Sequence, residues 1–155
     1  SYSQYLEDIA SWWNQTDPEW SRLRTEAITL LQQEDKLQQI VKLVGPDVLP
    51  DSQRLVLTVC EIIKTGLLQQ NAFDAIDMYS SPAKQIALLR AMLRFHERGR
   101  EIIDKGGTLA EIRQLPIVQQ LVRAKSTIAN DDTDGLRALA TRLEEQFAEI
   151  ERRLS

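Results

Sequence analysis

Apolar residues recur every three or four positions along most of the chain, which is the spacing of amphipathic helices. Residues 18–44 form the first such stretch, since Asp17-Pro18-Glu19 has the order of an N-cap, a first-turn proline and an acidic first turn. Gly45-Pro46 ends this helix. Its expected buried stripe is Leu30, Leu37, Val41 and Val44.

Two further helices are predicted after a loop at 45–51. The first is marked by Leu55, Val59, Ile62 and Ile63 and ends between Gly66 and Asn71. The second starts at Pro82 and ends at Gly106-Gly107. Its inward positions are expected to be Ile86, Leu89, Leu93, His96 and Ile103.

The rest of the chain is also predicted to be helical. Thr108 and Glu111 have capping-box spacing for a short helix that stops before Pro116, and another helix follows to about Ser126. After a polar break at 130–135, a last helix has the apolar seam Leu136, Leu139, Leu143, Phe147, Ile150 and Leu154. We therefore predict an all-α, multi-helix bundle at 1–129, and a polar break with a terminal helix at 130–155 that packs on the same domain or on a partner.

Composition excludes several classes of function. The net charge is -4 with acidic and basic residues interspersed, so no basic surface for nucleic acid is expected. No apolar run is long enough for a membrane span, and no secretory leader is recognisable, so we expect a soluble, cytoplasmic protein without direct membrane insertion. The chain opens at Ser1 rather than Met, which suggests part of a larger protein.

Residues able to carry chemistry are few. Cys60, the single cysteine, is expected to be a buried, inert thiol, and His96, the single histidine, lies on an apolar helix face where a structural role is commoner than catalysis. Neither GxxxxGK[ST] nor GxGxxG occurs, so no phosphate-binding loop is present. We expect no catalytic residue and no metal site here, and no ATP hydrolysis by this chain alone.

One segment matches a known family closely. The residues Leu67-Leu68-Gln69-Gln70-Asn71-Ala72-Phe73-Asp74, followed by Tyr79-Ser80-Ser81-Pro82, resemble the segment that marks the C-terminal domain of the catalytic A subunit of V-type and A-type rotary ATPases. Asp17-Pro18-Glu19-Trp20 and Leu43-Val44-Gly45-Pro46-Asp47 follow the same family in order and spacing. The resemblance implies the helical C-terminal domain of such a protein, with residues 1–129 as its body.

The resemblance also implies partners and cofactors. In this family three A and three B subunits alternate around a central rotor shaft and couple ATP hydrolysis or synthesis to proton or sodium transport. ATP or ADP with Mg²⁺ would bind mainly to the preceding domain of the parent protein, so no tightly bound cofactor is expected on this chain. The head of such a motor is cytoplasmic and peripheral to the membrane.

Two sites follow from the resemblance. Phe73, with Gln70, Asn71 and Ala72, falls where a related subunit lays an aromatic ring against adenine, although a ring that fills the core is the alternative. The loop that would face the rotor is Pro46, Asp47, Val48, Leu49, Pro50 and Asp51. Its two prolines restrict the backbone and predict a stiff projection, although a plain helix connection is the alternative.

A second functional interpretation remains open from the sequence. A stand-alone helical scaffold or protein-interaction module would also lack catalytic groups and could use the terminal apolar seam to bind a partner. That interpretation gives no reason for the motif at 70–74.

Overall fold

The structure is a computed structural model that describes residues 18–69 and 80–155. Within these two ranges every regular element is a helix, which confirms the all-α prediction. In chain order the elements are α2 (Pro18–Val44), the 3₁₀ turn η2 (Pro46–Val48), α3 (Asp51–Ile63), the π-helical turn η3 (Lys64–Leu68), α5 (Pro82–Asp104), α6 (Leu109–Arg113), α7 (Ile117–Thr127) and α8 (Thr133–Leu154).

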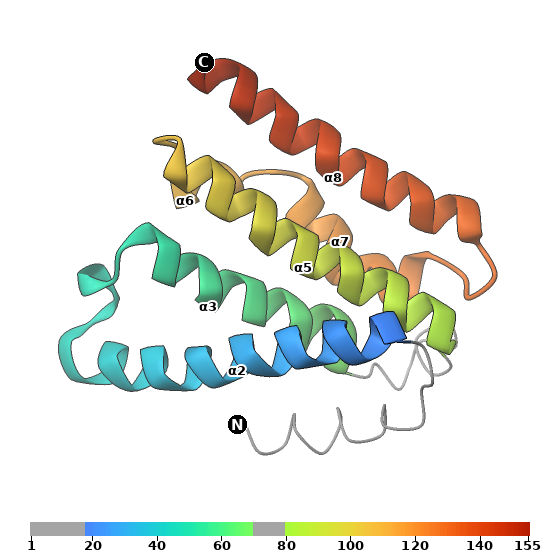
Figure 1. Ribbon diagram of the computed structural model, residues 1–155, viewed down its shortest axis with the longest axis horizontal. Coiled ribbons are helices and arrows are strands. Elements are labelled where there is room, and N and C mark those ends of the chain that lie inside the picture. The colour runs from blue at the N-terminus through green and yellow to red at the C-terminus, as the bar shows by residue number, and fades with distance from the viewer. Residues whose placement is uncertain (1–17, 70–79) are drawn as a thin grey trace.

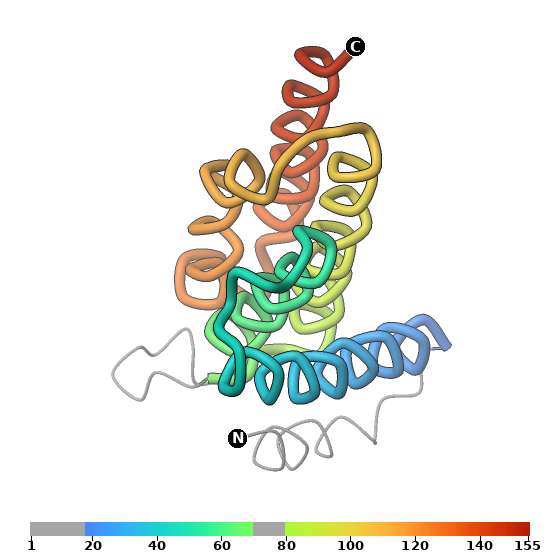
Figure 2. Tube along the Cα trace, turned by 90° about the vertical axis from the view of Figure 1, so that its left-hand side faces the viewer, coloured from blue at the N-terminus to red at the C-terminus, as the bar shows by residue number. Residues whose placement is uncertain are grey.

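Helix α5 is the centre of the bundle. It packs against α2, α3, α7 and α8 (Figure 1). Helices α2 and α3 run antiparallel on one side, joined through η2, while α8 covers the opposite side (Figure 2). Because neighbours surround α5, its buried face is wider than one stripe.

Local sequence signals set the helix ends. Ser81 caps α5 by accepting a hydrogen bond from the backbone N–H of Lys84 at 3.2 Å, and Thr108 and Glu111 form the predicted capping box of α6. Gly45 and Gly106 end α2 and α5 in the left-handed region, with φ of 87° and 96°. These boundaries confirm the predicted ranges of both long helices.

The core extends through all the long helices. Its largest fully buried apolar side chains include Trp20, Phe95, Phe147, Leu23, Leu31, Leu55, Ile63, Leu88, Leu89 and Met92. Leu55, Val59, Ile62 and Ile63 are buried as predicted, and so are four of the six residues of the terminal seam: Leu139, Leu143, Phe147 and Ile150.

Two parts of the predicted burial pattern are wrong. Val44 is exposed rather than buried, because packing against the core ends before the last residues of α2, where Val41 is only partly buried. On α5, Ile86 and Ile103 are only partly buried. The deeper positions are Leu88, Met92, Phe95 and Ile102, which face the neighbours on several sides of this central helix.

Candidate functional site

The loop between α2 and α3 is a compact turn. The backbone N–H of Leu49 donates to the carbonyl of Pro46 at 3.2 Å, and the Leu49 side chain is buried in the core. The carbonyl of Pro50 accepts from Gln53 and Arg54, both at 3.0 Å, which starts α3. The loop is therefore held at both ends while its outer residues stay in solvent.

Exposed apolar side chains gather at this loop. Leu43 is 85% exposed, Val44 60%, Val48 55% and Ile40 42%, and they are the large apolar side chains left exposed within the two described ranges. We call these four residues the apolar patch. The end of α2 and η2 lie at one end of the molecule's longest axis (Figure 1). A cluster of exposed apolar residues on an otherwise charged surface is typical of a contact site for another protein.

The two carboxylates of the predicted loop differ in their surroundings. Asp51 accepts a hydrogen bond from the backbone N–H of Leu109 at 3.0 Å and lies 3.8 Å from Arg54. It therefore ties the start of α3 to α6. Asp47 is exposed in η2, next to the apolar patch. Of these two carboxylates, Asp47 alone lies in solvent beside the apolar patch. The outer surface of the loop is therefore more apolar than acidic.

The predicted adenine-contacting residues lie outside the described ranges: Gln70, Asn71, Ala72 and Phe73. The chain is described up to Gln69, whose backbone N–H donates to the carbonyl of Lys64 at 2.8 Å and closes η3. Lys64 also places its ammonium 2.8 Å from Glu34, which joins η3 to α2. A π-helical turn of this kind often occurs next to a functional segment.

A continuous helical rod connects the two predicted sites along the chain. Helix α3 begins at Asp51, the last residue of the loop, and η3 follows it without a break up to Leu68. With 13 residues in α3 and five in η3, the rod is roughly 25 Å long. Residue Gln69, at its far end, directly precedes the predicted adenine-contacting residues.

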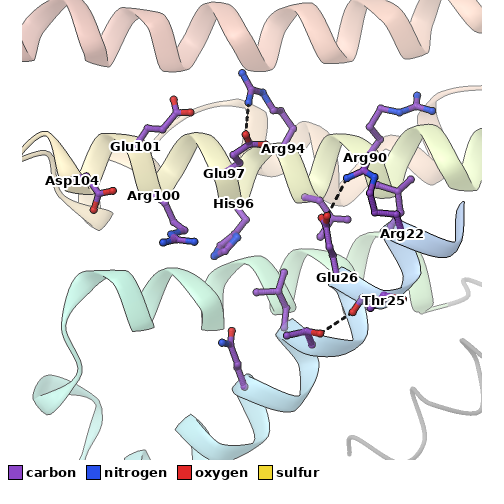
Figure 3. A pocket seen from close by; sticks show the side chains of 15 residues that line it. Arg22, Thr25, Glu26, Arg90, Arg94, His96, Glu97, Arg100, Glu101 and Asp104 are labelled. Carbon is purple, nitrogen blue, oxygen red and sulfur yellow. Dashed lines mark hydrogen bonds and ion pairs between the residues drawn. The ribbon is translucent and has the colours of Figure 1, made fainter. Parts of the chain in front are cut away.

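A groove of about 770 Å³ lies between α2 and α5 (Figure 3). Arg22 and Glu26 of α2 form one wall with an ion pair at 3.0 Å, and Arg94 and Glu97 of α5 form another pair at 3.1 Å. His96 and Arg100 point from α5 toward the α2 side (Figure 3). Positive and negative side chains alternate along this lining, so it does not present the convergent positive charge of a phosphate site.

Cys60, one of the two residues that could carry chemistry, lies inside the core. The thiol of Cys60 is buried and donates to the carbonyl of Leu30 at 3.3 Å, and burial raises the pKa of that thiol. The structure confirms the predicted burial of Cys60, and a buried protonated thiol is a poor nucleophile. Across residues 18–69 and 80–155, His, Cys, Asp and Glu form no group of three that could hold a metal ion.

His96 gives a pH-dependent stability that can be measured. Burial, followed by the charge of Arg100, lowers the pKa of His96 below 6.5, while Glu97 opposes this shift. The unfolded chain then binds a proton more readily, so the free energy of unfolding should be highest above pH 6.5 and fall as the pH drops through the folded pKa. Urea denaturation at intervals from pH 7.5 to 5.0 measures this slope.

His96→Gln is the control for that experiment, because His96 is the chain's only histidine. The substitution should flatten the slope between pH 6.5 and 5.0, where carboxylates contribute little. A free energy of unfolding that rises as the pH falls from 6.5 to 5.0 would contradict the expected direction.

Comparison with known proteins shows which family the chain belongs to. Residues 10–113 match the family described as the C-terminal domain of V and A type ATP synthase. The chain belongs to this family. The chain is 42% identical over 151 residues to the A subunit of the A-type ATP synthase of Desulfurococcus sp. (strain SY), a match that covers 97% of this chain and 25% of that relative.

Two other relatives agree with this assignment. The A subunit of the A-type ATP synthase of Methanopyrus kandleri is 40% identical over 151 residues, with 97% of this chain and 26% of the relative covered. The V-type ATP synthase alpha chain of Halothermothrix orenii is 40% identical over 148 residues, with 95% and 25% covered. The chain thus spans about a quarter of the length of these curated relatives. The family assignment supports the interpretation of the chain as the C-terminal domain of an ATP synthase A subunit.

The interpretation of the sequence missed most of the apolar patch. It placed Val48 in the loop but assigned Val44 to the core and gave no role to Ile40 or Leu43. One signal was available, because Ile40 and Leu43 extend the apolar positions of this turn beyond the stripe that Leu37, Val41 and Val44 form. In the described residues, no helix is both long enough and apolar enough to cross a membrane.

Proposed function

We propose that this domain serves the catalytic subunit of a V/A-type rotary ATPase in two ways, through a rotor-facing surface at one end and an adenine contact at the other. The surface would push on, or be pushed by, the central rotor shaft. The adenine contact would be made by Phe73 with Gln70, Asn71 and Ala72. ATP or ADP with Mg²⁺ would be held mainly by the preceding domain, and B subunits would be the neighbours in a soluble head peripheral to the membrane.

The observation that carries the proposal is the apolar patch. Val48 lies in the loop that the family resemblance assigns to the rotor, and the other three residues of the patch lie at the end of α2, directly before that loop. A contact that slides over a turning shaft benefits from apolar surface, because apolar packing does not depend on the matched pairs that ionic contacts need. Leu49 and the two prolines hold the turn that presents the patch.

The α3–η3 rod supports a mechanical link between the two proposed roles. Helical hydrogen bonds run along it from the loop to Leu68, so a displacement at Asp51 can reach Gln69 without passing through a flexible linker. Nucleotide binding at one end of the rod and rotor position at the other would both shift the position of this one rigid element. This is the geometry expected of a domain that converts nucleotide occupancy into motion of a shaft.

The paired substitution Leu43→Asp with Val48→Asp tests the rotor-facing role. Both side chains are more than half exposed, so the free energy of unfolding should change by no more than about 0.5 kcal/mol each. In the assembled motor, ion transport per ATP hydrolysed should fall by roughly threefold or more, because charge replaces the apolar contact. Parallel assays of ATP hydrolysis and ATP-driven ion uptake in vesicles measure this ratio.

Gln32→Asp with Gln33→Asp is the matched control, since it adds the same charge to exposed positions of α2 more than a turn before the patch. Coupling should stay at the wild-type ratio in this control. Wild-type coupling in the Leu43 and Val48 variant as well would rule out the patch as the rotor contact.

A further inference from the structure

The groove between α2 and α5 has walls that are held in place. At one end, the Arg90 guanidinium of α5 donates to both carboxylate oxygens of Glu19 on α2, at 2.6 and 2.7 Å. The lining also includes apolar side chains that belong to the core: Leu23, Leu30 and Leu93. Because a two-point ion pair and core packing fix both helices, the groove is preformed, which lowers the entropy cost of binding a partner.

Most charged side chains along the groove already have partners. The ion pairs are Arg22 with Glu26, Arg90 with Glu19, Arg94 with Glu97, and Glu101 with the buried Arg98. Beyond Glu26, the described part of the α2 wall is uncharged, since its remaining lining residues are Thr29, Leu30 and Gln33. The far half of α2 therefore offers no carboxylate to the cations of α5.

Arg100 is a cation of this groove that lacks a partner within the domain. Its side chain is exposed and points, with that of His96, from α5 toward α2 (Figure 3). Within residues 18–69 and 80–155 the Arg100 side chain makes no hydrogen bond or ion pair, although Asp104 lines the groove one turn further along α5. A guanidinium has five N–H donors and no acceptor, so an acceptor from a binding partner can pair with it.

A carboxylate is the acceptor that suits Arg100 best, because its two oxygens can take two parallel N–H bonds from one guanidinium. A free phosphate suits the groove less, since Glu97 and Asp104 place negative charge on the same helix. Residues four apart on a helix lie side by side, so Arg100 and Asp104 together match a helix with an acidic and a basic residue one turn apart. The groove, at about 770 Å³, has room for several side chains of such a helix.

We infer that the groove between α2 and α5 binds a helix of a neighbouring subunit of the motor, with a carboxylate of that helix on Arg100. The inference rests on the proposed function, because it takes the domain to be assembled in a rotary ATPase. Matched charge pairs need fixed positions, so this neighbour is a subunit that stays beside the domain rather than the turning shaft. The apolar patch is a separate surface: Ile40 follows Gln33 by seven residues of α2, roughly 10 Å.

Carbodiimide cross-linking of the assembled motor tests the inference with Arg100→Lys. This substitution keeps the positive charge and supplies an amine. The amine and a touching carboxylate then form an amide bond, and the carbodiimide takes up the water that is lost. The expected product joins position 100 to an aspartate or glutamate of a neighbouring head subunit, as found by mass spectrometry of the digested motor. Bonds from position 100 to carboxylates of this chain alone would overturn the inference, and so would a bond to the shaft.

Arg142→Lys is the matched control. Arg142 is an exposed arginine of α8 outside the groove, and in the described part of the chain its side chain also makes no hydrogen bond or ion pair. Its amine should form no bond with the carboxylate that reacts at position 100. An equal yield of that bond from Arg142→Lys would show a reaction that does not depend on the groove, and it would overturn the inference.

Charge reversal in Arg100→Glu measures how much the contact contributes to assembly. Two carboxylates would then meet in the groove, so the subunit should leave the assembled motor about tenfold faster or more. Exchange against labelled subunit measures this rate, which should stay at the wild-type value in Arg142→Glu. Both arginines are exposed and have no ion pair among the described residues, so the melting temperature of either variant should stay within about 3 °C. An unchanged rate in Arg100→Glu would overturn the inference.

The results separate this inference from the proposed function. A protein that assembles into no rotary ATPase would overturn both. If coupling is unchanged in the Leu43 and Val48 variant while Arg100→Lys forms the expected bond, the patch fails and the groove contact stands. If coupling falls in that variant while Arg100→Lys forms no bond to a neighbouring subunit, the groove contact fails and the patch stands.

Discussion

Replacing Phe147 by alanine should lower the free energy of unfolding by about 3–5 kcal/mol, the largest stability change we expect from one substitution in α8. Phe147 has 0% exposure, and its ring meets that of Phe95 edge-to-face with centroids 5.4 Å apart. The Arg98 guanidinium lies 5.8 Å above the same ring. The substitution leaves a cavity between α5 and α8 and removes both aromatic contacts. Urea denaturation of the chain measures the loss.

Leu136→Ala is the control, because Leu136 lies on the same helix but is only partly buried. Its cost should be roughly 1 kcal/mol. Ion pairs also join α8 to α5. Glu144 pairs with Arg94, and Glu151 pairs with Arg98 and with Lys105, which directly follows α5. Both variants keep these pairs. If Phe147→Ala costs no more than Leu136→Ala, α8 does not pack on α5 as the structure has it.

Phe73→Ala should raise KM for ATP roughly 5- to 150-fold in the assembled motor, if the ring stacks on adenine with about 1–3 kcal/mol. Stacking is equally strong in the ground state and the transition state, so its loss should leave kcat within about twofold. Phe73→Tyr keeps the ring face and should preserve KM. Steady-state kinetics over a range of ATP concentrations measure both parameters.

The alternative role of Phe73 as a core residue predicts a different result. Removing a core phenylalanine would lower the free energy of unfolding by about 3–5 kcal/mol and leave the KM of the assembled motor unchanged. Melting temperature and KM must therefore be measured on the same preparation. A normal KM together with a collapsed melting temperature would assign Phe73 to the core.

The helical boundaries could be predicted from the sequence because local chemistry sets them. Proline and serine start α5, Gly106 ends it in the left-handed region, and Thr108 with Glu111 caps α6. The seam of α8 was predictable for the same reason, since one face of that helix packs on the bundle and the rest meets solvent. The motif at 70–74, which led to the family, is also a property of the sequence alone.

Only the tertiary structure decided which apolar and charged side chains depart from the usual pattern. Val44 belongs to an exposed patch because, among the described residues, packing against the core ends near Val41, and helix spacing does not show where such packing ends. Lysines are expected at the surface, yet Lys84 and Lys125 are buried, because the end of η3 and the last turn of α7 present backbone carbonyls that meet only in the folded bundle. Local spacing determined the helices; contacts between residues far apart in the chain determined the apolar patch and the burial of the two lysines.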